Sequence, residues 1–362
     1  CRGRRAGCGK HAKGAPMIQQ KHNRAGFSAA ASILLVLLPL AAGLVCICIG
    51  RYSLTPKQAA ESIFSNLSAL LTGSQAITEQ YSKIVWSMRL PRVLLALMVG
   101  GGLSAAGVAF QSLFANPLAT PDTLGVASGA SLGAALGLLM GMHMLYVQLM
   151  ALLFGFLAVG LTFLVSRKRG SGNMTTVVLS GMVIASLFSA LVSLVKYTAD
   201  TDSQLPAITY WLMGSLSSAS WQSLRLASPF MLTGIILLFL IRWRLNILPL
   251  SEDEARATGV NIGLLRLTAA ACATMMTAAS VAMCGQVAWI GLLIPHVCRM
   301  AFGSDTTRLL PASICIGAAF MAAIDTIARS VTASEIPISI LTAIIGAPFF
   351  IHLLRQTRGW NS

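Results

Sequence analysis

The sequence predicts an all-α membrane protein with about ten transmembrane helices and both termini in the cytoplasm. Of its 362 residues, 56% are hydrophobic and only 10% are charged, whereas a soluble domain carries roughly 25% charged residues. Long apolar runs recur along the chain, and a run of about 20 apolar residues crosses a bilayer as a helix.

Positive charge orients these spans. Most of the 26 Lys and Arg lie in the N-terminal tail or, under the predicted topology, at the cytoplasmic ends of spans. This is the positive-inside pattern. The formal charge of +15 therefore indicates contact with membrane lipid headgroups and not with nucleic acid.

We expect three regions. Residues 1–26 form a basic cytoplasmic tail, residues 27–355 form the transmembrane domain, and residues 356–362 form a second cytoplasmic tail. The chain opens on Cys1 and Met17 is a candidate start, so residues 1–16 are left out of the fold prediction. The eight cysteines include no CxxC pair, which predicts neither a disulfide framework nor a metal site.

The spans follow the apolar runs in order. They are expected at residues 27–50, 89–114, 125 onward, 148–165, 174–195, 224–241, 267–284, 285–300, 308–328 and 336–354. Residues 51–88 lie outside, with an amphipathic surface helix at 56–71, and a short interfacial helix is expected within 208–216. Pro295 is expected to break its span.

The third span carries glycine at every fourth position, from Gly125 through Gly129, Gly133 and Gly137 to Gly141. Four residues advance a helix by about 400°, so this ridge drifts by about 40° per step. The ridge predicts steep helix crossings with close backbone approach, the small-xxx-small packing of membrane helices.

The loop at 242–266 gathers charge between two apolar runs. Ser251 stands three residues before Glu254, the spacing of a capping box. Glu252, Asp253 and Glu254 fall in the first turn, where the helix dipole favours negative charge, and Gly259 is placed to end the helix. We predict a short capped helix that docks on a partner; the alternative is a solvated connector.

Several long stretches resemble one family of permeases, which import cobalamin, haem and ferric siderophores with ATP-driven partners. The stretches, in chain order, are RLPRVLLALMVGGGLSAAGVAFQSLFANPLATPDTLGVASGASLG (89–133), GLLIPHVCR (291–299), IDTIAR (324–329) and EIPISILTAIIGAPFFIHLL (335–354). The resemblance implies a cobalamin-importer-permease-like fold of ten spans, paired with a second, identical or different, permease subunit over two ATP-binding subunits.

The chain has no GxxxxGK[ST] phosphate loop. The resemblance therefore implies a transport subunit and not an enzyme, with ATP and Mg on the partner ATPase and no cofactor on this chain. It also gives the short helix of the central loop the role of a coupling helix that seats on the ATPase. The residues assigned to it are Ser251, Glu252, Asp253, Glu254, Ala255, Arg256 and Gly259.

Three arginines are predicted at the outer surface, where positive charge is less expected. By resemblance, Arg89, Arg92 and Arg329 receive acidic residues of a periplasmic or lipid-anchored substrate-binding protein, which Arg can pair with in two-point fashion. Asp325 stands four residues before Arg329, the order that favours an intrahelical pair. The alternative is that these arginines only anchor span ends in the membrane.

The cytoplasmic mouth of the pathway is predicted by the same resemblance. Asn116, Pro117 and Leu118 match a stretch near that mouth, and Met174 and Thr175 are expected opposite. An alternative is a mere helix break. No metal ligand is assigned to His296, since it has no neighbouring ligand in the sequence.

The predicted function is that of a permease subunit in the bacterial inner membrane. It belongs to a binding-protein-dependent importer of an iron chelate, with a ferric siderophore favoured over haem and cobalamin. An ion-coupled secondary transporter is the main rival, but such proteins place ionisable residues at mid-membrane, and Asp325 is the only acid well inside a predicted span. An intramembrane enzyme is disfavoured because no HExxH motif and no paired intramembrane carboxylates occur.

Overall fold

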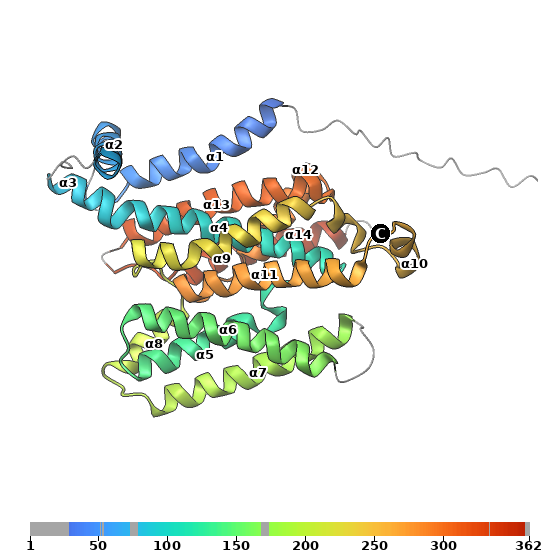
Figure 1. The fold of residues 1–362 in the computed structure, drawn as a ribbon. Coiled ribbons are helices and arrows are strands. Elements are labelled where there is room, and N and C mark those ends of the chain that lie inside the picture. Colours follow the sequence, from blue (N-terminus) through green and yellow to red (C-terminus); the bar gives the residue numbers. More distant parts are fainter. Residues whose placement is uncertain are drawn as a thin grey trace, which may run out of the picture.

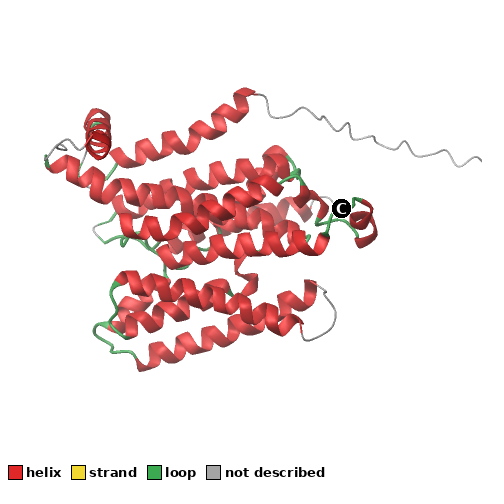
Figure 2. Cartoon of the chain, viewed as in Figure 1, coloured by secondary structure: helices red, strands yellow, loops and turns green. Residues whose placement is uncertain are grey.

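A computed structural model describes residues 29–50, 52, 54–72, 79–167, 174–332 and 334–358. All regular structure in these residues is helical (Figure 2). The basic tail predicted at 1–26 lies outside the described residues, as does the end of the C-terminal tail from residue 359 onward.

The described helices alternate long spans with short connecting turns. They are α1 (Ala29–Cys48), α2 (Pro56–Thr72), α3 (Gln80–Lys83), η1 (Ile84–Arg89), α4 (Leu90–Leu113), η2 (Pro121–Leu124), α5 (Val126–Leu139), α6 (Met144–Arg167), α7 (Met174–Thr198), α8 (Gln204–Leu212), α9 (Trp221–Ile241), η3 (Arg244–Ile247), α10 (Glu252–Ala257), α11 (Ile262–Cys284), α12 (Ile290–Phe302), α13 (Thr306–Ser330) and α14 (Ile338–Arg358). Seven are long and apolar enough to cross a membrane; α5, α12 and α14 are shorter apolar helices. Together they account for the ten predicted spans.

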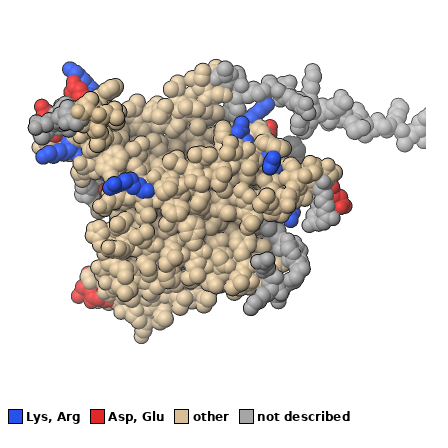
Figure 3. Space-filling model, viewed as in Figure 1, with Lys and Arg blue, Asp and Glu red and all other residues tan. Residues whose placement is uncertain are grey.

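The two ends of the bundle differ (Figure 1). The helices α2, α3 and α8 lie at one end, which the charge distribution predicts to be outside and which is called the outer end below. The opposite, cytoplasmic end carries α10 and the end of α14. On the face drawn in Figure 3, charged side chains gather toward these ends and the surface between them is almost free of charge. Apolar side chains such as Leu153 and Val183 are exposed on the sides of the bundle, as expected for a surface covered by lipid.

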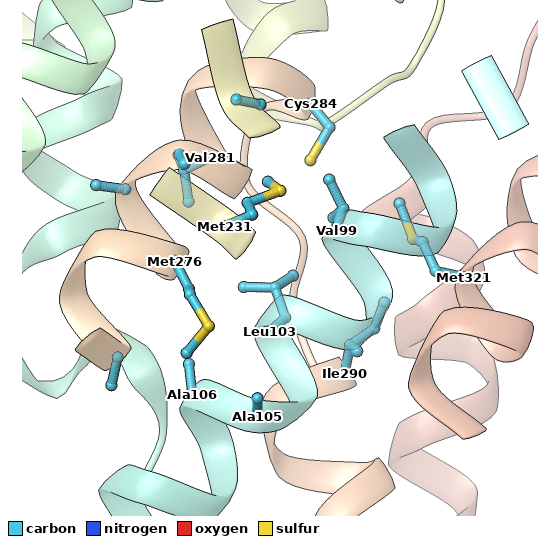
Figure 4. Packing of buried hydrophobic residues seen from close by; sticks show 14 of the residues in the cluster. Val99, Leu103, Ala105, Ala106, Met231, Met276, Val281, Cys284, Ile290 and Met321 are labelled. Carbon is cyan, nitrogen blue, oxygen red and sulfur yellow. The ribbon is translucent and has the colours of Figure 1, made fainter. Parts of the chain in front are cut away.

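The helix α4 forms the centre of the bundle and is buried along most of its length. Figure 4 shows side chains from α9, α11, α12 and α13 directed toward it, with Met231, Met276 and Met321 around Val99 and Leu103. Flexible methionine side chains fill irregular gaps in such cores.

Two glycines let neighbouring backbones touch α4. A methyl group on Gly100 would lie 2.2 Å from the carbonyl oxygen of Gly317 in α13. One on Gly107 would lie 1.9 Å from the carbonyl oxygen of Gly291 in α12. Only glycine fits at such distances, so these contacts are close helix packing of the kind that membrane proteins use. The glycine ridge predicted in the third span does not include either of these contacts.

The predicted glycine ridge lies on α5 only in part. Gly129 and Gly133 pack against α6, where added methyl groups would lie 2.5 Å from the carbonyl oxygen of Phe154 and 2.2 Å from that of Met150, and Gly137 contacts Val147. Gly125 instead precedes α5 with a φ of +75° and packs against α7. Gly141 lies beyond the helix in a turn with a φ of +65°.

The structure corrects three of the predicted boundaries. The second span begins at Gln80 and not at residue 89, because α3, η1 and α4 run on as one helix through a segment predicted to lie outside. Pro295 lies inside α12 without breaking it; neighbouring helices let membrane helices tolerate such a residue. The interfacial helix α8 covers Gln204–Leu212 and so ends earlier than expected.

Candidate functional sites at the two ends of the bundle

At the outer end, the guanidinium of Arg92 lies between two carboxylates. Its Nε is 3.0 Å from both carboxylate oxygens of Asp325, and its Nη2 is 2.8 Å from Oδ1 of the same residue. On its other edge, Nη1 donates to Oε1 of Glu335 at 2.8 Å and Nη2 to Oε2 at 2.9 Å. Such two-point pairing fixes orientation as well as charge.

Arg89 and Arg329 cap the end of α1. Arg89 Nη1 donates to the carbonyl oxygens of Ile47 at 2.7 Å and Cys48 at 3.1 Å, and its Nη2 donates to that of Tyr52. Arg329 Nη2 donates to the carbonyl oxygen of Cys46. The last carbonyls of a helix have no partner within it and carry partial negative charge. The two guanidinium groups therefore satisfy the end of α1.

These residues form one group, which we call the arginine cluster: Arg89, Arg92, Asp325, Arg329 and Glu335. The structure thus brings the three arginines predicted for docking together. It also gives each of them partners within the chain, and Arg89 and Arg329 are only 6% and 9% exposed. Their docking role stays a prediction. The predicted pair of Asp325 with Arg329 is present at 3.6 Å, but Asp325 makes its shorter contacts with Arg92.

Sequence reasoning missed the role of Glu335. It is the first residue of a stretch that carried the family resemblance, but it lies 243 positions from Arg92. No spacing rule links residues so far apart, and only the position of both at the outer ends of predicted spans hinted that they could meet.

At the cytoplasmic end, the short helix α10 projects beyond the bundle (Figure 1). The hydroxyl of Ser251 donates to Oε2 of Glu254 at 2.8 Å, and the Ser251 amide donates to the same oxygen at 3.2 Å. The Glu254 amide donates back to Ser251 Oγ at 3.5 Å. This is the capping-box arrangement. Asp253 is exposed and Ala255 is buried, while the side chains of Glu252 and Arg256 lie outside the description.

Gly259 follows α10 with a φ of +72°, a left-handed conformation that glycine adopts without steric cost. The loop also contains η3, a short helix before α10 that the sequence analysis did not predict. The structure therefore shows an ordered, self-capped loop. Its docking on an ATPase remains a prediction.

A cavity of about 1010 Å³ lies beside this loop, between the ends of α4 and α12, η3 and the start of α13. Asn116 and Pro117 line it, and Leu118 is exposed next to them. The Leu118 amide donates to Oδ1 of Asn116 at 2.9 Å, which closes the turn after α4. Met174 and Thr175 begin α7, but their side chains lie outside the description, so the structure does not test the predicted opposition.

Hydrogen bonds connect the elements that line the cavity. Arg299 Nη2 donates to Oε1 of Gln111 at 2.9 Å, which links α12 to α4. Asp305 accepts hydrogen bonds from the Thr307 amide at 3.0 Å and from Nδ2 of Asn246 at 2.8 Å. Burial alone would raise the pKa of the Asp305 carboxyl, but these hydrogen bonds and the nearby Arg308 outweigh it and lower that pKa. The cavity wall is thus joined to η3.

Within the described residues, no group of three or more His, Cys, Asp and Glu side chains could hold a metal ion. His296 packs against Phe350, with ring centroids 5.9 Å apart.

The ten apolar helices and the charged groups confined to their ends define a polytopic membrane protein whose sites suit partner contacts. The model of the FecCD transport family matches residues 34–356. The chain belongs to this family.

The chain is similar to known proteins along most of its length. It is 41% identical over 317 residues to the molybdate import system permease protein MolB of Haemophilus influenzae, covering 87% of this chain and 92% of the relative. It is 38% identical over 278 residues to a probable iron chelatin transport system permease protein of Helicobacter pylori, covering 77% and 84%. A solved "metal-chelate type" ABC transporter in an inward-facing conformation superposes with a TM-score of 0.80 at 37% identity, over 91% of this chain and all of the other. The chain is accordingly an ABC importer permease of the FecCD family.

Proposed function

We propose that this chain forms the pathway for a metal species across a bacterial inner membrane, with a second permease subunit, two ATP-binding subunits and a periplasmic or lipid-anchored substrate-binding protein. The observation that supports this most is the likeness to transport permeases over nearly the whole of their length. The arginine cluster supports an acidic partner outside, and α10 supports an ATPase partner inside.

The cargo proposed first is a ferric siderophore. Two stretches, PDTLGVASGAS (121–131) and TYWLMGSL (209–216), resemble the siderophore importers more than the haem or cobalamin importers. The likeness to the iron chelatin permease is consistent with this choice.

Molybdate is the second candidate. The specific observation in its favour is the 41% identity to a molybdate import permease, over 92% of that relative. Haem and cobalamin stay as further alternatives within the same family.

Uptake by cells that lack their own importers for both cargoes separates the candidates. The complete importer would be supplied with either a radiolabelled ferric siderophore or radiolabelled molybdate. We expect accumulation of the siderophore iron and none of the molybdate. The reverse result would assign the oxyanion, and accumulation of neither would reject both cargoes.

A further inference from the structure

The two carboxylates bound to Arg92 differ in depth. The Asp325 side chain is 1% exposed, that of Arg92 13% and that of Glu335 24%. Exposure to solvent therefore increases from Asp325 through Arg92 to Glu335. Glu335 is the most exposed of the three, and it lies in the segment that joins α13 to α14.

We infer that Glu335 occupies the position on Arg92 that a carboxylate of the binding protein takes on docking, so that docking exchanges one carboxylate for the other. This inference rests on the proposed docking role of the outer end. It adds that Glu335 competes with the binding protein for Arg92. It also explains how Arg92, although already paired, can bind a carboxylate of that partner.

Two-point pairing of a further carboxylate with Arg92 requires such an exchange. All three nitrogens of the Arg92 guanidinium donate to Asp325 or Glu335, so the fork presents no free edge to a third carboxylate. Asp325 cannot leave, because its departure would strand the buried charges of Arg92 and Arg329, and an unpaired buried charge is strongly destabilising. Glu335 can leave, because its side chain is partly exposed and is hydrated on release.

Charge also favours the arrival of an acidic partner. The cluster holds three arginines against two carboxylates, and the described partners of Arg89 are carbonyl oxygens. The cluster thus carries excess positive charge, which attracts and orients an acidic surface. Because one ion pair replaces another, the net gain is small and docking stays reversible.

The exchange would also reach the last span. Next to Glu335, the Ile336 amide donates to the carbonyl oxygen of Ala328 at 3.1 Å. The Ile338 amide donates to that of Gly214 at 2.9 Å. Release of Glu335 removes the contact that holds this segment to α4, and so loosens the start of α14 where it meets the end of α8.

The test is a titration of the complete importer in lipid nanodiscs with its fluorescently labelled binding protein. Glu335→Gln removes the competing charge at nearly constant volume, and we expect the Kd to fall roughly fivefold. Glu335→Asp keeps the charge on a shorter side chain and should give a smaller fall. The matched control is Glu61→Gln on α2, which removes one negative charge at the same end from a residue paired with Lys57; its Kd should stay close to that of the unmodified protein.

A purely structural Glu335 predicts the opposite order. Loss of its carboxylate would then weaken docking, most for Gln and less for Asp, along with a lower melting temperature. That order, or equal Kd values for all variants, would overturn the inference. If the unmodified importer does not bind its binding protein at all, it is the docking role in the proposed function that fails.

Discussion

The arginine cluster and α10 are built in opposite ways. Arg92 meets Asp325 and Glu335 across 233 and 243 positions of sequence, whereas α10 is capped by residues three positions apart. The cluster is largely buried, and both two-point edges of the Arg92 guanidinium are occupied, one by Asp325 and the other by Glu335. Asp253 on α10 is exposed, and nothing lies within 4 Å of the position that a Cβ on Gly259 would take.

Under the proposed docking roles, the two sites would contact their partners in two different ways. On α10, the described side chains of Asp253 and Glu254 are already exposed, so the proposed ATPase contact would need no rearrangement of these two residues. The cluster must first give up an internal contact. Substitutions in the two regions should therefore have different effects on stability and on partner binding.

Asp325→Asn should destabilise the protein most. The side chain neutralises Arg92 and Arg329 at 2.8 and 3.6 Å in a buried position, and removing one partner of a buried ion pair costs about 3–5 kcal/mol. Asp202→Asn at the exposed outer surface is the control, with an expected change within about 0.5 kcal/mol. Thermal melting of the purified complex measures both. Equal melting temperatures for the two variants would show that the ion pair of Asp325 with Arg92 does not stabilise the fold.

Gly133→Leu should have the next largest effect. The new leucine side chain would push apart the backbones of α5 and α6. Overpacking of this kind destabilises a folded protein by about 1–3 kcal/mol or more. The variant should therefore have a lower melting temperature than Leu136→Ala. Gly160→Ala in α6, where nothing lies within 4 Å of an added methyl group, should leave it unchanged or raise it slightly. If Gly133→Leu melts like Leu136→Ala, close contact of the two backbones does not stabilise the bundle.

Asp253→Lys should weaken association with the ATPase and leave the melting temperature of the permease unaltered. Asp253 is exposed and takes no part in the capping box. Its reversal therefore changes the surface charge of α10 and leaves the capping box in place, at a cost of about 0.3–1 kcal/mol in helix-dipole interaction. Asp202→Lys at the outer end is the matched control. Co-purification of the ATPase at increasing salt measures the effect, and equal retention by both variants would contradict a docked α10.

Contacts between residues close together in the sequence were predictable, and contacts between residues far apart in the sequence were not. The capping box was predictable because Ser251 and Glu254 interact across one turn, and the spans were predictable because hydrophobicity is continuous over each of them. The bond between Arg92 and Glu335 was not, since it depends on how α4, α13 and α14 pack. The same holds for Gly107 against Gly291, where neither residue shows which partner it has.

The wrong boundaries have a related cause. Residues 80–88 are polar enough to suggest a loop, yet they continue the helix because Ser82 and Val85 are buried against neighbouring elements. Tertiary packing thus overrode a local signal. Local reasoning about Pro295 failed in the same way, because the surrounding helices support α12.

Transport into proteoliposomes tests the central claim most directly. The importer would be reconstituted in proteoliposomes with an imposed proton gradient, and cargo uptake would be measured with ATP and with the binding protein each withheld in turn. We expect uptake only when both are present, at a rate that a protonophore does not change. Uptake that proceeds without ATP and stops when a proton gradient is abolished would contradict this expectation, and would assign the chain to ion-coupled transport.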